Sequence, residues 1–347
     1  MKFNLHAIYA LAKADFAGED QFSLHLPLEI AEGVRLEDIS ALTSPNSFDS
    51  VRKRMGTDAS EQLEGVRYAL VHRFEPRFIF DQGKQELITE EMQDEASQQR
   101  VFMLVNCLRL IRPTRESAQN MHGDVRKDGS FDVMGLAHPV DLLETPENQK
   151  LFAIRDEDMQ ELLTLSPRFL RAMRGDYWKF RMPVQFYELG HYQQYSPKAR
   201  YLLWMSAIEG LYTSNAEQGS NVAKARIRWF LGASTSVYPP GELSDLLADP
   251  RINIDGVLDD LYNMRNYIAH GDQLPDSYFT GGKRDGIAGP VNLFNVLLEA
   301  ASFIIRRSLL KILKDDLLEH FKGADSAQMY FAANGFSKKA ILAKLKT

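Results

Sequence analysis

The sequence predicts an α+β region followed by an all-helical bundle, so that the chain as a whole is mainly helical. Two observations predict this division. Alternating apolar residues, typical of half-buried strands, occur in the first third, as in FSLHLPLEI (22–30). From about Ser196 onward, the sequence is instead almost entirely helical in pattern. Because 347 residues are enough for two domains, we expect an α+β domain at 1–190, a helical bundle at 195–322 and a short basic helical tail at 323–347.

The first region is expected to mix strands with helices. A long helix should follow Thr89, which can cap it, and should end before Pro113, because proline cannot continue a helix. The segment between 113 and 150 is rich in Gly, Asp, Asn and Pro, which indicates loops. The other elements expected here are two strands within 66–81 broken at Pro76, a short strand at 131–137, and helices at 156–173 and 182–195.

The second region contains helices with recognisable ends. Ser196 and Pro197 form a favoured start, and the residues that follow are apolar nearly all round, which predicts a buried central helix. Gly271 is placed to terminate the helix that begins near Asp255. The other expected helices are 220–231, capped by Ser220 and ended by Gly232, one within 291–321 after a glycine-rich loop, and a basic amphipathic one capped by Ser337.

Composition excludes several classes of function. A net charge of −6 argues against a protein that coats nucleic acid through bulk charge, so a nucleic-acid site would need a local basic patch. Cys107 is the single cysteine, which excludes a disulfide framework, and its apolar helical surroundings predict a buried thiol. No segment resembles a signal peptide or the ~20 apolar residues of a membrane helix, so we expect a cytoplasmic protein with no membrane partner.

The segment LYNMRNYIAHGD (261–272) combines arginine, asparagine and histidine near the end of a helix. Arginine followed within a few residues by histidine is weak on its own, since the chain has it three times: Arg67 to His72, Arg115 to His122 and Arg265 to His270. The first pair is expected on a strand and the second in a loop. Only the third lies on a capped amphipathic helix, so it is the candidate site.

These residue types suit RNA cleavage without a metal. Histidine as a residue type can take or give a proton near neutral pH, which makes His270 a candidate acid or base, while Arg265 offers a planar set of donors to phosphate oxygens. Asn266 is four residues from His270 and shares its helical face. Arg265 lies about 140° round the helix from His270, because each residue turns ~100°. Arg265 must therefore reach over, or meet the histidine of another subunit.

Together, ARYLLWMSAIEGLY (199–212) and LYNMRNYIAHG resemble the Apea-like branch of the HEPN superfamily over residues 195–322. The resemblance implies an all-helical bundle, a homodimer and a metal-independent endoribonuclease that acts in stress, toxin or anti-phage systems. It also implies a composite site in which Arg265 binds phosphate, His270 is the general base or acid, and Asn266 orients one of them. Since many relatives do not cleave RNA, the alternative is a non-catalytic dimeric module that binds a nucleotide, nucleic acid or protein.

Several further residues are candidates for supporting roles. Glu209 is a lone carboxylate on an otherwise apolar helix, so it needs a partner, and Arg265 is the natural one. Lys224 and Arg228 are four residues apart next to Trp229, which allows phosphate contacts and stacking, although Trp229 and Phe230 also suit a core. The other candidates for RNA-backbone contacts are Lys283 and Arg284, in a glycine-rich loop that also suits a plain solvated surface.

No cofactor or metal is expected, because His191 and His320 lack companions at ligand spacing and the glycine-rich loop matches no phosphate-binding motif. The first region matches no family by its motifs. Its place beside a nuclease-like bundle suggests a sensor or regulatory role, with a protein or nucleotide as the regulatory ligand.

Overall fold

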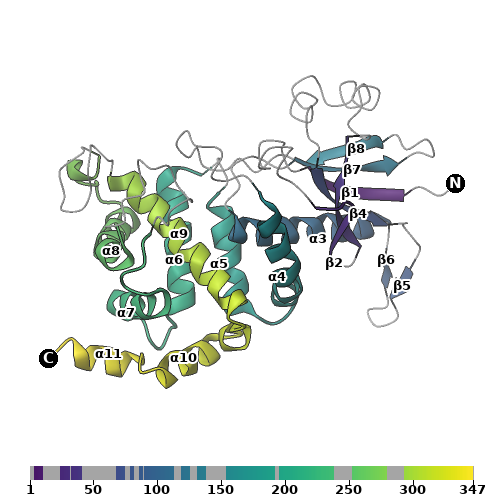
Figure 1. The fold of residues 1–347 in the computed structure, drawn as a ribbon. Helices are drawn as coiled ribbons and strands as arrows, with labels where there is room; N and C mark the ends of the chain where they lie inside the picture. The colour runs from purple at the N-terminus through teal and green to yellow at the C-terminus, as the bar shows by residue number, and fades with distance from the viewer. Residues whose placement is uncertain are drawn as a thin grey trace. The chain divides into compact units, whose positions relative to one another are not determined.

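The computed structural model forms two compact units, one of residues 1–144 with 152–170 and one of residues 145–151 with 171–347 (Figure 1). The division falls within helix α4 (Asp156–Arg174), so helix α5 (Trp178–Leu189), which the sequence analysis placed in the first domain, belongs to the second unit. The residues that the structure describes are 4–10, 24–31, 33–40, 68–74, 79–81, 86–88, 90–112, 119–125, 131–137, 154–191, 195–237, 252–279 and 293–346.

The first unit is built on a six-stranded sheet in the order β2-β3-β4-β1-β7-β8, with every pairing antiparallel. Helix α3 (Glu90–Ile111) packs against β1 and β4 of this sheet. This arrangement confirms the predicted α+β class. The strands are β1 (Asn4–Ala10), β2 (Leu28–Ala31), β3 (Val34–Asp38), β4 (Tyr68–Phe74), β7 (Gln119–Val125) and β8 (Phe131–Ala137), with β5 (Ile79–Asp81) and β6 (Glu86–Ile88) forming a separate hairpin.

Buried side chains join the helices of this unit to each other and to the sheet. The guanidinium of Arg112, at the end of α3, donates two hydrogen bonds to the carboxylate of Asp158 on α4, at 2.9 and 3.0 Å. Ser166 on α4 donates to the backbone oxygen of Ile30 on β2. Cys107 is fully buried, as predicted, and burial raises the pKa of its thiol.

Two sequence interpretations in the first unit were wrong. In the segment 22–30, residues 24–27 are not in a strand, and β2 begins only at Leu28, since Pro27 has no amide hydrogen to donate to a ladder. His122 lies in β7 rather than in a loop, because β7 pairs with both β1 and β8. Backbone pairing with a strand on each side outweighs the low strand propensity of the Gly and Asp residues in β7. The two strands expected within 66–81 are present as β4 and β5, and Pro76 lies outside the described residues.

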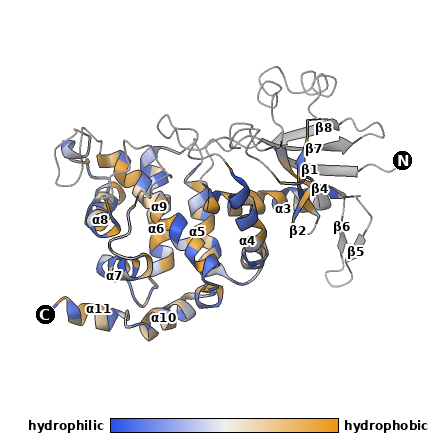
Figure 2. Ribbon diagram, in the orientation of Figure 1, coloured by the Kyte–Doolittle hydropathy of each residue, from blue (hydrophilic) through white to orange (hydrophobic). Residues whose placement is uncertain are grey.

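The described secondary structure of the second unit consists of helices, with one isolated β-bridge between Ser236 and Asn253. This confirms the predicted all-helical bundle. Helix α6 (Pro197–Tyr212) is its centre and contacts α5, α7, α8 and α9. Figure 2 shows apolar residues along α6, of which Trp204, Ile208 and Leu211 are buried. Around α6 lie α7 (Ser220–Leu231), α8 (Ile254–His270), the short helix η3 (Asp276–Tyr278), α9 (Leu293–Lys314), η4 (Leu318–Phe321), α10 (Ala324–Ala333) and α11 (Lys338–Lys344).

Most predicted helix ends are confirmed, but those of α5, α7 and α9 were wrong. The helix expected at 182–195 is α5, which spans Trp178–Leu189. Ser196 and Ser337 cap α6 and α11 as expected, each accepting from a backbone amide three residues later. Ser220, however, is the first residue of α7 rather than its cap. The long helix expected to reach Phe321 ends at Lys314, because Asp316 takes a left-handed conformation and the Leu317 amide donates back to Ile312. No helix among the described residues is long and apolar enough to cross a membrane.

Candidate active site

Helix α8 presents the candidate residues, because its other face is fixed in the core. Val257, Leu261 and Met264 are buried at three- and four-residue spacing. At its C-terminal end, Gly271 has a φ of 75°, which glycine adopts without steric cost, and its amide donates to the Ile268 oxygen. His270 is therefore the last helical residue, and its side chain is exposed to solvent.

Arg265 is held against helix α6. Its Nη2 donates to Oε2 of Glu209 at 3.2 Å, which confirms the predicted pair, and its Nη1 lies 3.5 Å from Oδ1 of Asn266. The Arg265 side chain is 33% exposed, so it stays accessible from one side. Next to this pair, the Tyr262 hydroxyl is buried without a hydrogen-bond partner among the described residues. Burial, followed by the charge of Glu209, raises the pKa of Tyr262.

His270 and Asn266 line an open groove of about 480 Å³, whereas Arg265 does not line it. The groove has an aromatic wall, where the rings of Tyr267 and Tyr278 meet edge to face at 6.2 Å. Among the described residues, its lining includes no lysine or arginine. The described residues that line it are Asp260, Asn263, Asn266, Tyr267, His270, Asp272, Pro275, Ser277 and Tyr278.

Within one chain, the structure therefore places Arg265 beside Glu209, and His270 beside Asn266 in the groove. It does not place Arg265 in the groove with His270. Within the described part of the chain, no hydrogen bond joins Asn266 to His270, and the Asn266 amide oxygen is turned to Arg265 instead. This matches the angular separation expected of residues five apart on a helix.

Lys224 and Arg228 on α7 are engaged by carboxylates on α8. Lys224 donates to Asp259 at 2.6 Å, and this hydrogen bond lowers the pKa of Asp259. Arg228 donates in the same way to Asp255. Both predicted phosphate contacts are thus neutralised in this structure.

The neighbouring aromatic residues of α7 pack against protein. Phe230 is buried, in agreement with the core reading, and the ring of Trp229 stacks on Phe336 with 5.0 Å between centroids. Trp229 is therefore not an open stacking surface for a base. Lys283 and Arg284, the remaining basic candidates, lie outside the residues that the structure describes.

Among the described residues, neither His191 nor His320 lies in a cluster of possible metal ligands. His191 is buried between the rings of Tyr187 and Trp204, and His320 stacks on Tyr330 at 4.7 Å. Across the described ranges, no three His, Cys, Asp or Glu side chains converge to hold a metal ion.

Sequence reasoning missed the groove residues that accompany His270. Asp260, Asn263 and Tyr267 precede it at spacings of three and four, which place them on one helical face. This spacing could have been recognised once the helix was predicted. The sequence does not show that Pro275, Ser277 and Tyr278 also line the groove.

Beyond this geometry, the likeness to Apea-like HEPN domains depends on the two motifs and the order of the helices. The Glu209–Arg265 pair connects those two motifs in space. No family model, curated protein or solved structure matches this chain.

Proposed function

We propose that this chain is a metal-independent endoribonuclease of the HEPN type that acts as a homodimer in a stress or defence response. The observation that carries the proposal is the position of His270 at the end of α8. Its imidazole is exposed in a groove beside Asn266, one turn away, rather than buried in its own bundle. An accessible imidazole next to an amide and an aromatic wall suits a bound nucleotide.

In the proposed reaction, His270 accepts the proton of the ribose 2′-hydroxyl. The freed 2′-oxygen attacks the adjacent phosphorus, the bond to the 5′-oxygen breaks, and a 2′,3′-cyclic phosphate remains. The leaving 5′-oxygen takes a proton from an acid, a role that suits the protonated histidine of the second copy. Arg265 stabilises the extra negative charge on the phosphate oxygens.

Arg265 can serve phosphate while it stays paired with Glu209. A guanidinium has five donors, and one of its nitrogens faces Glu209 at 3.2 Å while another faces Asn266 at 3.5 Å. The side chain is one-third exposed, so its remaining donors are open to a ligand. Glu209 thereby serves as a positioning residue that fixes the direction of the guanidinium.

A second candidate function is a non-catalytic dimeric HEPN module that binds a nucleotide, nucleic acid or protein. The charge around His270 favours the protein-binding form of this module, because Asp260 and Asp272 line the groove while no described lysine or arginine does. Carboxylates beside a phosphodiester raise the cost of binding it. In either case we assign the α+β unit a sensor or regulatory role.

RNA digestion in EDTA distinguishes the two candidates. We expect wild type to cleave RNA to products with cyclic phosphate ends. The rates of Arg265→Ala and His270→Ala should each fall at least about 100-fold, which is the size of effect seen when a positioned acid or base is lost. Matched controls are His320→Ala, another exposed histidine, and Arg171→Ala, another arginine in a surface ion pair. Equal rates in all variants would contradict the proposal, and RNA binding without cleavage by wild type would favour the second candidate.

A further inference from the structure

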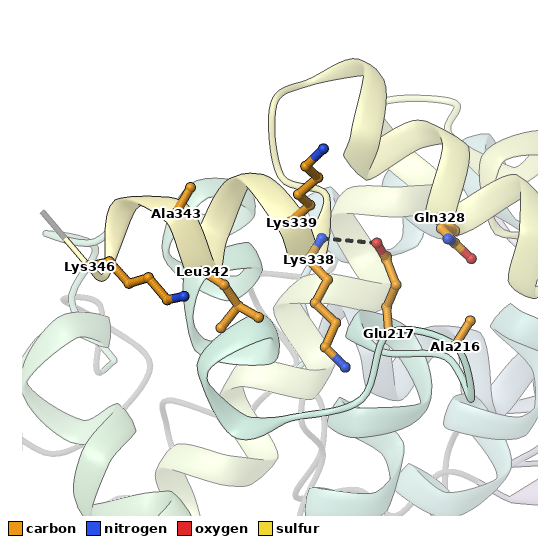
Figure 3. A pocket seen from close by; sticks show the side chains of 8 residues that line it. All are labelled: Ala216, Glu217, Gln328, Lys338, Lys339, Leu342, Ala343 and Lys346. Carbon is orange, nitrogen blue, oxygen red and sulfur yellow. Dashed lines mark hydrogen bonds between the residues drawn. The ribbon is translucent and has the colours of Figure 1, made fainter.

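A second pocket, of about 660 Å³, lies between α11, α10 and the loop that follows α6 (Figure 3). Pockets of ~300–1,000 Å³ are of the size that binds ligands. None of its residues lines the groove at His270. Its lining is Ala216, Glu217, Gln328, Lys338, Lys339, Leu342, Ala343 and Lys346.

Among the described lining residues, the one carboxylate is already engaged in other contacts. Glu217 is buried, and its Oε2 forms an ion pair with the buried guanidinium of Arg226. Its Oε1 accepts a hydrogen bond from the backbone amide of Lys338 at 2.9 Å, which Figure 3 shows as a dashed line. Because both oxygens are engaged, Glu217 fixes the start of α11 but does not neutralise the lysine side chains.

The lysines around the pocket have no acidic partner. Lys338, Lys339 and Lys346 form no ion pair with any residue that the structure describes. The last 14 residues, 334–347, contain four lysines and no Asp or Glu, although the whole chain has a net charge of −6. This surface therefore carries a local positive charge that attracts an anionic ligand.

Apolar side chains accompany this charge. Leu342, in the lining, is 39% exposed, and nearby Leu345 on the tail and Met329 on α10 are 62% and 66% exposed. Exposed leucine and methionine beside lysines suit a ligand that has both carboxylates and aliphatic groups.

Single-stranded RNA fits the pocket less well. Proteins that bind it offer aromatic rings for stacking, and the described residues that line this pocket include no aromatic residue and no arginine. Phe336, the aromatic residue just before α11, is stacked on Trp229 instead.

We propose that this pocket binds an acidic segment of a partner protein. Carboxylates of the segment pair with Lys338 and Lys346, while an aliphatic side chain between them packs on Leu342. The inference goes beyond the proposed nuclease function and uses none of its residues.

Fluorescence anisotropy with the full chain tests the proposal. The probe is a labelled 10-residue peptide made of glutamates around two central leucines. Control probes carry glutamine for each glutamate, or serine for each leucine, and a labelled oligouridine of equal length tests RNA. The protein variants are Lys338→Gln with Lys346→Gln, Leu342→Ser, and a matched control, Lys198→Gln with Lys322→Gln, in which neither lysine lines the pocket.

We expect the acidic peptide to bind more tightly than either control peptide, and less tightly as salt rises. The Lys338/Lys346 variant should bind about threefold to tenfold more weakly, as for two lost surface ion pairs, and the Lys198/Lys322 variant should lose less. Four results would overturn the proposal: no binding up to about 1 mM peptide, equal binding of the glutamine peptide, equal loss in both double variants, or lysine-dependent binding of the oligouridine alone. Unchanged thermal unfolding of the variants shows that they are folded.

Discussion

Arg265 and Glu209 lie 56 residues apart in the sequence, yet their charged groups meet at 3.2 Å between α8 and α6. The pair joins the helix that ends in the candidate histidine to the central helix of the bundle. Each side chain is about one-third exposed, so the pair contributes little to the stability of the fold. Its main effect is to fix the orientation of the Arg265 guanidinium.

Replacing Glu209 with Gln should separate these two effects. Loss of a partly exposed ion pair should lower the free energy of unfolding by at most about 1 kcal/mol. Arg265, released from its anionic partner, should bind free phosphate or oligonucleotide more tightly but position it less well. Urea denaturation measures the first effect and oligonucleotide binding the second. A large loss of stability would show that the pair is a structural element instead.

The buried Arg226–Glu217 pair should behave in the opposite way. The two side chains are only 1% and 9% exposed, so replacing Arg226 with Met leaves a buried, uncompensated carboxylate. We expect the free energy of unfolding to fall by about 3–5 kcal/mol, measured by urea denaturation. The surface pair Lys224–Asp259 supplies the control, since Lys224→Met should cost at most about 1 kcal/mol. Similar losses in both variants would contradict this ranking.

Two glycines should respond to alanine for different reasons. At Gly271 an added Cβ meets nothing within 4 Å, but the φ of 75° is unfavourable for alanine, so we expect a loss of about 1 kcal/mol. At Gly190 the added Cβ would overlap the indole of Trp204, which is fully buried. Gly190→Ala should therefore lower the midpoint of thermal unfolding much more than Gly271→Ala. A reversed order would show that the end of α8 is under greater constraint.

Glu299 should make stability depend on pH. Burial raises its pKa from 4.5 to about 7, and its Oε2 has no hydrogen-bond partner among the described residues. Because the folded state holds the proton more tightly than the unfolded state, this group lowers stability as pH rises from 4.5 to 7. The full effect is up to about 3 kcal/mol.

Urea denaturation of wild type and Glu299→Gln at pH 5 and pH 8 tests this prediction. The variant should gain stability relative to wild type at pH 8 and gain much less at pH 5. The same difference between the two proteins at both pH values would contradict the assignment.

Features set by local chemistry could be predicted from the sequence. Ser196, Ser337 and Gly271 define helix ends through contacts within a few residues, and such signals are readable in a single chain. The Glu209–Arg265 pair was also predictable, because a carboxylate on an apolar helix must find a partner.

Features that depend on distant segments could not be predicted. His122 lies in a strand because β1 and β8 flank it, and β1, at residues 4–10, is far from it in the sequence. The carboxylates of α8 that form ion pairs with Lys224 and Arg228 could not be predicted either. The end of α9 was missed because a left-handed aspartate is not a usual stop signal.

The network around Arg226 determines where the chain can be shortened. The guanidinium donates to backbone oxygens of Tyr212 and Phe336, and Glu217 joins it to the first turn of α11. A stop codon placed before Phe336 would remove one acceptor and expose the buried aromatic cluster around Phe331. The last dozen residues are therefore an integral part of the bundle, and affinity tags or fusions belong after them rather than in their place.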